Sequence, residues 1–224
     1  GEDFRKIQKS VVRILIKIDL AVFWCTGSLV NNTDYNYEPY ILSAEHCGLS
    51  GSDIAPQSDL DNWTFYFNYE SPDCANPQNE GNLNRQRLTG ATALANSKDG
   101  GGDFGSDFLL LKLTSNIPTE FNAYYLGWSH QGASPPKNRV GIHHPSGDIK
   151  KISTYQFPSE SGSFGNIVEH THWVVEWQKT INGHGTTEQG SSGSPLFDEN
   201  NLIRGVLTGG GSACNNLKGQ DYYG

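Results

Sequence analysis

Apolar and polar residues alternate along several short stretches of the chain. In residues 12–18 every second residue is Val or Ile, and charged residues occupy positions on the other face. The same period orders the large apolar side chains of residues 63–69 and of residues 173–177. An alternation with period two predicts strands with one buried face. The continuous apolar run Phe108–Leu113 is typical of a strand covered on both faces.

Turn-forming residues separate these stretches. Clusters such as SKDGGGDFG at residues 97–105 and NGHGTT at residues 182–187 mark turns or loops. No stretch has the pattern of a long amphipathic helix, and we find no internal repeat. Many short strands joined by turns predict an all-β fold, either a sandwich or a barrel. A weak midpoint near residues 115–122 would join two halves.

The composition of the chain excludes some classes of binding partner. The 224 residues are 35% hydrophobic, which is enough to bury a core. The net charge of -8 argues against a nucleic-acid partner, because phosphate binding needs a basic face. No apolar run approaches the roughly 20 residues of a membrane-spanning helix. We therefore expect neither nucleic acid nor a membrane as partner.

The chain has four cysteines, Cys25, Cys47, Cys74 and Cys214. None forms a C-x-x-C pair, so a zinc ribbon or a thioredoxin-type motif is not indicated. Scattered cysteines in a chain rich in Asn, Gly, Ser and Thr fit an exported, oxidised protein. No leader segment is evident, which fits a mature form. We expect a secreted or periplasmic location.

His46 follows a predicted strand in the segment YILSAEHCG. A lone histidine there is more often an ordinary surface or hydrogen-bonded residue. The adjacent Cys47 favours a functional role for His46, because a disulfide with Cys25 would hold the histidine against the preceding strand.

Asp107 stands at the entry to the apolar run. It could merely cap a turn, but a carboxylate entering a buried strand needs a partner, and a histidine N–H is suitable. Asp103 is the rival candidate, although its glycine neighbours place it in an exposed turn.

Three serines lie in the segment EQGSSGSPLF at residues 188–197. Covalent acyl transfer needs an exposed hydroxyl, a base and backbone N–H groups aimed at the developing oxyanion. A preceding glycine permits the tight conformation that directs such N–H groups. Composition alone does not choose between Ser191, Ser192 and Ser194. After this segment, the predicted strand at residues 203–208 runs into glycines and would suit pairing with an extended substrate, or a plain hairpin.

The histidines of the chain raise the alternative of a metal-binding site. His143 and His144 are adjacent, and His170 and His172 would share one face of a strand. No Glu or Cys stands at a recognised ligand spacing from them. We therefore expect no metal site and no cofactor.

The segments AEHC, SDFLLL and GSSGSP, in the order His, Asp, Ser, resemble trypsin- and chymotrypsin-like serine proteases. The resemblance is closer to bacterial lysyl endopeptidases. It is carried from about residue 22 to the C-terminus by CTGSLVNNT, AEHCG, SDFLLL, LGW followed by IHHPSGDIKKIS, HWVVEW, EQGSSGSPLFD, and GGGSAC followed by DYYG.

This resemblance implies an all-β peptidase domain over residues 1–224. Two six-stranded antiparallel β-barrels, at about residues 1–118 and 119–224, would flank the active site in the cleft between them. The family normally continues beyond the position of Gly224 with a strand and a helix, so a C-terminal tail could be missing from this sequence. The expected partner is a protein or peptide substrate, bound by a monomer.

The resemblance also implies roles for individual residues. Ser192 would be the nucleophile, His46 the general base and then acid, and Asp107 the residue that orients His46. The N–H groups of Gly190 and Ser192 would form the oxyanion hole. Ser191 stands where trypsin-type zymogens carry an aspartate that pairs with a new N-terminal ammonium. We therefore expect an oxyanion hole that does not depend on the N-terminus.

The resemblance implies a Cys25–Cys47 disulfide but leaves the other two cysteines open. In lysyl endopeptidases their counterparts pair with cysteines near the N-terminus, and none precedes Cys25 here. Cys74 and Cys214 could pair with each other, both be free, or lack partners on an absent N-terminal segment.

Substrate specificity follows from Asp221. Trypsin carries its specificity aspartate at the position of Thr186, whereas Asp221 matches the aspartate with which lysyl endopeptidases bind lysine. The alternative for Asp221 is a turn residue beside Gly219. Further substrate-binding candidates are Thr187, Phe164, Thr208, Gly209 and Gly210.

Two positions depart from the family pattern. Lysyl endopeptidases carry a histidine at the position of Thr208, which works with an aromatic residue whose counterpart is Phe164. Glu45 precedes His46 where small or neutral residues are usual. If its carboxylate lay near the imidazole it would raise that pKa, and if it faced solvent it would do little.

Two other functions stay open. An inactive homologue would serve as a binding module. A glutamyl endopeptidase would bind an anionic side chain with a histidine and hydroxyls, which His184 and Thr187 could supply.

Overall fold

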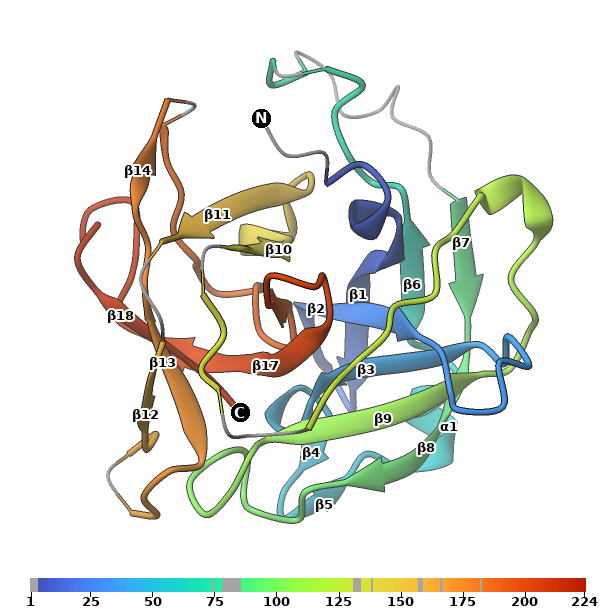
Figure 1. Ribbon diagram of the computed structural model, residues 1–224. Coiled ribbons are helices and arrows are strands. Elements are labelled where there is room, and N and C mark those ends of the chain that lie inside the picture. Colours follow the sequence, from blue (N-terminus) through green and yellow to red (C-terminus); the bar gives the residue numbers. More distant parts are fainter. Residues whose placement is uncertain are drawn as a thin grey trace.

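The first half of the chain forms one antiparallel sheet, at the right of Figure 1. The computed structural model describes residues 4–73, 75–77, 86–130, 134–137, 139–156, 159–165, 167–181 and 183–224. Within these residues the strand order is β7-β6-β1-β2-β3-β9-β8. The strands are β1 (Val11–Ile18), β2 (Ala21–Val30), β3 (Tyr40–Ala44), β6 (Thr64–Phe67), β7 (Gln86–Thr89), β8 (Ala91–Asn96) and β9 (Phe108–Leu113).

The second half forms a second antiparallel sheet with the order β11-β10-β16-β17-β18-β13-β12, at the left of Figure 1. Its strands are β10 (Arg139–His143), β11 (Lys151–Tyr155), β12 (Glu160–Gly162), β13 (His172–Glu176), β16 (Pro195–Phe197), β17 (Ile203–Gly210) and β18 (Gln220–Tyr223). Two-stranded ribbons are formed by β4 (Leu49–Ser50) with β5 (Asp53–Ile54), and by β14 (Lys179–Thr180) with β15 (Gly183–His184).

Both sheets curl. The opposite edges of the first sheet, β7 and β8, are separated in the chain by Gly90 alone. The opposite edges of the second sheet, β11 and β12, are separated by residues 156–159. Edges so close in sequence must lie near each other, so each sheet bends into a half-barrel. The expected all-β double-barrel fold is confirmed. Each sheet has seven strands in the described residues rather than six, because short edge strands such as β12 also pair.

The period-two pattern explains the burial of β1 and β9. Alternate Ile side chains of β1 are buried in the core of the first half-barrel. In β9, Leu109 and Leu111 enter this same core, while Leu110 packs against a cluster that contains residues of both halves. Both faces of β9 are therefore covered, as its continuous apolar run predicts.

Three apolar clusters organise the interior. One fills the first half-barrel and one, around Trp177 and Tyr223, fills the second. The third joins the two halves and contains Ile7, Val11, Val30, Leu126, Val140, Ile142, Phe197 and Ile203. Because this shared cluster joins the two halves, side chains from both halves can line one cleft between them.

Helical turns in the described residues are short. They are η1 (Ile7–Ser10), η2 (Glu45–Cys47), α1 (Gln57–Leu60), η4 (Thr119–Phe121) and η5 (Pro145–Gly147). None of the helices described is long and apolar enough to cross a membrane. Two of these turns, η2 and η5, carry residues of the candidate site.

Candidate active site

His46 lies in the turn η2, directly after β3. The neighbouring Cys47 forms a disulfide with Cys25 of β2, as the resemblance implies. Because β2 and β3 are also paired strands, this bond ties the histidine backbone to the sheet at a second point. Of the two remaining cysteines, Cys214 is an exposed free thiol, and Cys74 lies outside the described residues.

Asp107 holds His46 with both carboxylate oxygens. Its Oδ2 lies 2.6 Å from His46 Nδ1, and its Oδ1 accepts the His46 backbone N–H at 2.9 Å. The Asp107 side chain is fully buried, whereas 31% of the His46 side chain is exposed. A carboxylate bonded to Nδ1–H fixes the tautomer in which Nε2 is free to accept a proton. The rival Asp103 is exposed in its turn, as expected.

Glu45 does not face solvent, so that alternative drawn from the sequence is wrong. Its side chain is buried, and its carboxylate accepts hydrogen bonds from Ser97 Oγ and from the backbone N–H groups of Lys98, Asp99 and Gly101. The distances lie between 2.8 and 3.2 Å. The residue before the histidine thus holds the loop that leads to Asp107.

The serine segment forms a tight turn around Ser192. Gly190 and Gly193 have φ angles of +91° and +79°, which favour glycine. At Gly193 a side chain would also collide with Ser43 Oγ. Ser191 and Ser194 are fully buried, while Ser192 is partly exposed. Of the three serines, only the middle one can meet a substrate.

Two peptide N–H groups of this turn, those of Gly190 and Ser192, make no hydrogen bond with a described residue. The carbonyl of Gln189 accepts the N–H of Ser146 at 2.6 Å, and the carbonyl of Ser191 accepts the N–H of Ser194 at 3.0 Å. In a trans peptide the C=O and the following N–H point in opposite directions. The N–H groups of Gly190 and Ser192 therefore point away from these two bonds. Neither donates to another described residue, and both residues line the cleft between the two halves.

A cleft of about 470 Å³ lies between the two halves. Trp24 and His46 line it from the first half, and Ser146, Gly190 and Ser192 line it from the second. Ser192 Oγ makes no hydrogen bond with any described residue, including His46. Catalytic hydrogen bonds of this kind are often long without substrate and tighten in the complex. The cleft therefore brings together a serine hydroxyl, an oriented imidazole and two free N–H donors.

Asp221 lies in β18, opposite Gly210 of β17, and not in a turn. Its buried carboxylate accepts three hydrogen bonds on Oδ2: from Trp177 Nε1 at 2.6 Å, Thr187 Oγ1 at 2.7 Å and Ser212 Oγ at 2.6 Å. Among the residues that the structure describes, Oδ1 accepts only the Ser212 N–H, at 3.2 Å. The donors fix the carboxylate and leave Oδ1 with capacity for a cation.

Thr208 contacts a small cluster of rings, which lies near Asp107. Its Oγ1 lies 3.0 Å from His172 Nε2, and His172 packs against Phe164 and Tyr222. Burial lowers the pKa of His172, although the Asp107 carboxylate acts in the opposite direction. A histidine thus contacts Thr208 from another strand, which the linear sequence did not reveal.

The open edge of β17 is the remaining substrate-binding candidate. The strand β16 pairs with β17 only as far as Val206. Past Leu207, no described strand covers this side of Gly209 and Gly210. An extended peptide could add to this edge.

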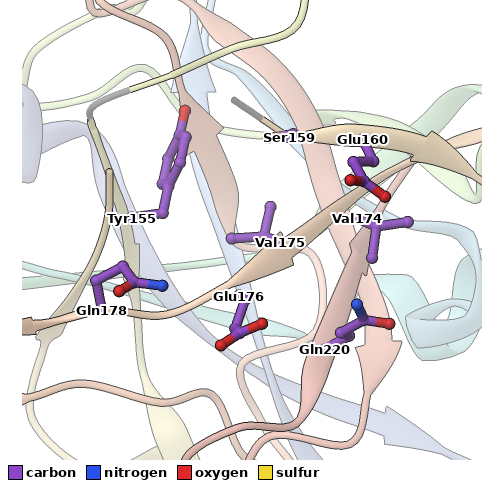
Figure 2. Close-up of a pocket in the computed structure, with 8 residues that line it drawn as sticks. All are labelled: Tyr155, Ser159, Glu160, Val174, Val175, Glu176, Gln178 and Gln220. Atoms are coloured by element: carbon purple, nitrogen blue, oxygen red, sulfur yellow. The ribbon is translucent and has the colours of Figure 1, made fainter. Parts of the chain in front are cut away.

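Other candidates are not brought together. His170 lies outside β13 and bonds to Ser161, so it does not share a strand face with His172. The hydroxyl of Thr187 bonds to Asp221, so an anionic side chain there would meet a carboxylate. A second cavity, of about 160 Å³, lies against β12, β13 and β18 and contains none of the expected site residues (Figure 2).

Sequence reasoning missed several of these contacts. Trp177 and Ser212 hold Asp221, and Ser146 holds the Gln189 carbonyl. The alternating pattern of residues 173–177 did place Trp177 in the core. No local signal in the sequence showed where its N–H would point.

Comparison with known proteins places the chain in a family. Residues 1–224 match the family described as "Lysyl endopeptidase, C-terminal domain". The chain belongs to this family of trypsin-like serine endopeptidases. It is 30% identical over 194 residues to a lysyl endopeptidase of Pseudomonas aeruginosa, a match that covers 85% of this chain and 38% of the relative. The chain spans about two fifths of the length of the curated relatives it matches.

Solved structures share the fold of this chain. The protease Anisep from Arthrobacter nicotinovorans has a TM-score of 0.67 at 15% identity, covering 96% of this chain and 89% of its own. The thermostable serine protease AL20 from an extremophilic microorganism has a TM-score of 0.65 at 11% identity, covering 96% and 90%. These likenesses support the chymotrypsin-like fold of two half-barrels.

Proposed function

We propose that this domain is a secreted serine endopeptidase that cleaves after lysine through an acyl-enzyme on Ser192. The observation that carries the proposal is the 2.6 Å contact between His46 Nδ1 and Asp107 in the cleft that also exposes Ser192. Burial of Asp107 makes this contact strong, because the carboxylate has little water to compete for it.

Ser192 Oγ attacks the carbonyl carbon of the scissile bond while His46 Nε2 takes its proton. Asp107 stabilises the imidazolium that forms. The N–H groups of Gly190 and Ser192 donate to the oxyanion of the tetrahedral intermediate. His46 then gives the proton to the leaving amine, and water hydrolyses the acyl-enzyme by the same steps.

Lysine specificity rests on Asp221. A lysine ammonium would meet Oδ1, because Oδ2 already accepts three hydrogen bonds. Thr187, Thr208, Gly209, Gly210 and Phe164 would form the walls and the edge that hold the substrate backbone.

Secretion is supported by the Cys25–Cys47 disulfide, since such bonds persist in oxidising compartments. We further propose that residues 1–224 form a single peptidase domain that acts as a monomer. The boundary near residue 118 falls between the last strand of the first sheet and the first strand of the second.

A fluorophosphonate probe and a peptide panel test the proposal. The probe should label Ser192 in the wild-type protein and not in Ser192→Ala. Peptides ending in Lys, Arg, Glu or Leu should be cleaved fastest after Lys. Absence of labelling in folded protein would favour a binding module, and fastest cleavage after Glu would overturn the assignment of Asp221.

A further inference from the structure

A chain of buried hydrogen bonds runs behind the nucleophile turn through the imidazole of His143. Its Nδ1 lies 2.8 Å from Ser191 Oγ, and its Nε2 lies 3.0 Å from Ser153 Oγ. His143 and Ser191 are completely buried and Ser153 is 1% exposed. The chain links β10 and β11 to the segment that carries Ser192.

The other hydrogen-bond partners of the Ser153 and Ser191 hydroxyls decide which group donates and which accepts in each bond of this chain. Ser153 Oγ donates to the carbonyl of Thr186 at 3.0 Å, so it accepts from His143 Nε2–H. With the proton of a neutral imidazole on Nε2, His143 Nδ1 is an acceptor, so Ser191 Oγ donates its proton to Nδ1 and itself accepts the N–H of Glu188 at 3.2 Å. A neutral imidazole with its proton on Nε2 satisfies every group in the chain.

The surroundings keep this imidazole neutral. Burial lowers the pKa of His143 to about 3, and the charge of Lys151 on β11 acts in the same direction. The other titratable neighbour is His144, which is also buried and has a pKa well below its ordinary value because of burial. Protonation of Nδ1 would remove the acceptor that Ser191 needs.

Ser191 lies between the two peptide groups that matter for catalysis. Its backbone N–H donates to the Glu188 carbonyl, and its carbonyl accepts the Ser194 N–H. The tie from its side chain to His143 adds a third point, which prevents the turn from rotating about its own backbone. At this position trypsin-type enzymes use an ion pair with the N-terminus, whereas here the anchor is neutral and internal.

We propose that His143 is a positioning residue for the oxyanion site, acting through the Ser191 hydroxyl to orient the N–H groups of Gly190 and Ser192. This inference rests on the proposed function. It makes catalysis independent of the N-terminal ammonium and dependent on one neutral histidine of the second half-barrel.

The first test compares His143→Leu, Ser191→Ala and His143→Asn with a control, His130→Gln, which removes an exposed histidine. For the first two variants we expect kcat to fall roughly 10- to 100-fold, less than the roughly 10²–10³-fold loss of a whole oxyanion donor, with KM changed less than about threefold. His143→Asn should recover part of the rate, because its amide oxygen can accept near the position of Nδ1.

Affinity for a peptide boronate ending in lysine should fall by a factor similar to that in kcat, while product binding stays the same. The double variant His143→Leu/Ser191→Ala should lose no more than the worse single variant, since both act through one bond. Folded variants with unchanged kcat, or losses that multiply, would overturn the proposal.

The second test needs no catalysis and no variant. In 15N spectra of the wild-type protein, His143 should be the neutral Nε2–H tautomer throughout about pH 5 to 8. A Nδ1–H tautomer, or protonation within this range, would overturn the inference whether or not the protein is a protease. Failure of fluorophosphonate labelling in the wild type would instead count against the proposed function.

Discussion

The carboxylate of Glu45 accepts the backbone N–H of Asp99 at 3.0 Å, and the carboxylate of Asp99 accepts the N–H of Asp107 at 2.8 Å. Burial acts to raise the pKa of Asp99, but hydrogen bonds from the N–H groups of Asp107 and Gly102, together with those to the side chains of Glu45 and Ser97, outweigh it and lower the pKa. Asp107 itself has a φ angle of +54°, an uncommon conformation for a residue other than glycine. Two buried carboxylates therefore fix the backbone that presents the third carboxylate to His46.

Glu45→Gln should weaken this arrangement. An amide has one acceptor oxygen, and its NH₂ group would face backbone donors of the loop that Glu45 now satisfies. We expect the free energy of unfolding to fall by about 1–3 kcal/mol, the cost of leaving buried polar groups unpaired. Urea denaturation measures this, and kcat should fall as well because Asp107 loses its support. Glu120→Gln on the exposed turn η4 is the control, and equal stability of both variants would contradict the role of Glu45.

The most regular strands, such as β1, β6, β9 and β13, and the three chemistry-bearing segments could be predicted from the sequence, because both depend on local order. Alternation along β1 and the apolar run of β9 follow from neighbours two residues apart. His46, Asp107 and Ser192 stand in short motifs whose order along the chain is itself informative.

The hydrogen-bond partners of the site residues could not be predicted, because they are contacts between segments that are distant in the sequence. Glu45 is more than fifty residues from the loop that it holds. Trp177 and Asp221 are 44 residues apart and meet only because β13 pairs with β18. The sequence identifies such side chains as polar or apolar but does not show which atoms they meet.

Asp221→Asn tests the proposed lysine pocket. If the amide oxygen takes the place of Oδ2, the NH₂ group takes the place of Oδ1 and faces the substrate ammonium. We expect kcat/KM for peptides ending in Lys to fall roughly 10²- to 10³-fold, the range for truncating a buried charge pair. Cleavage after Leu and fluorophosphonate labelling of Ser192 should stay near wild type. Equal losses for Lys and Leu peptides would mean that Asp221 is structural only.

Removal of the disulfide, by Cys25→Ala/Cys47→Ala, should cost stability and activity together. Cross-links closing loops of this size, here 22 residues, stabilise proteins by about 2–4 kcal/mol. Activity should fall too, because Cys47 anchors the turn that presents His46. Thermal denaturation with and without reductant measures the first effect. Cys214→Ser, which alters an exposed thiol, should leave both unchanged, and a reduced protein with an unaltered melting temperature would refute the prediction.

Two buried histidines should make the protein sensitive to mild acid. Burial lowers the pKa of His143 to about 3, and it lowers that of His144 well below the ordinary value. In the unfolded chain both would titrate near about 6.5. Below that pH the unfolded state binds protons that the folded state does not, so stability falls as the pH falls.

The expected loss between about pH 7 and 5.5 is about 2–3 kcal/mol for the two histidines together, before most carboxylates begin to titrate. Urea denaturation at several pH values measures it. In His143→Gln the loss over this window should be smaller by about 1 kcal/mol, the share of one buried imidazole. Stability that stays constant over this window would contradict the prediction, because both imidazoles would then have to take up protons in the folded protein as readily as in the unfolded chain. The hydrogen bond from Ser191 to His143 could not then persist in acid.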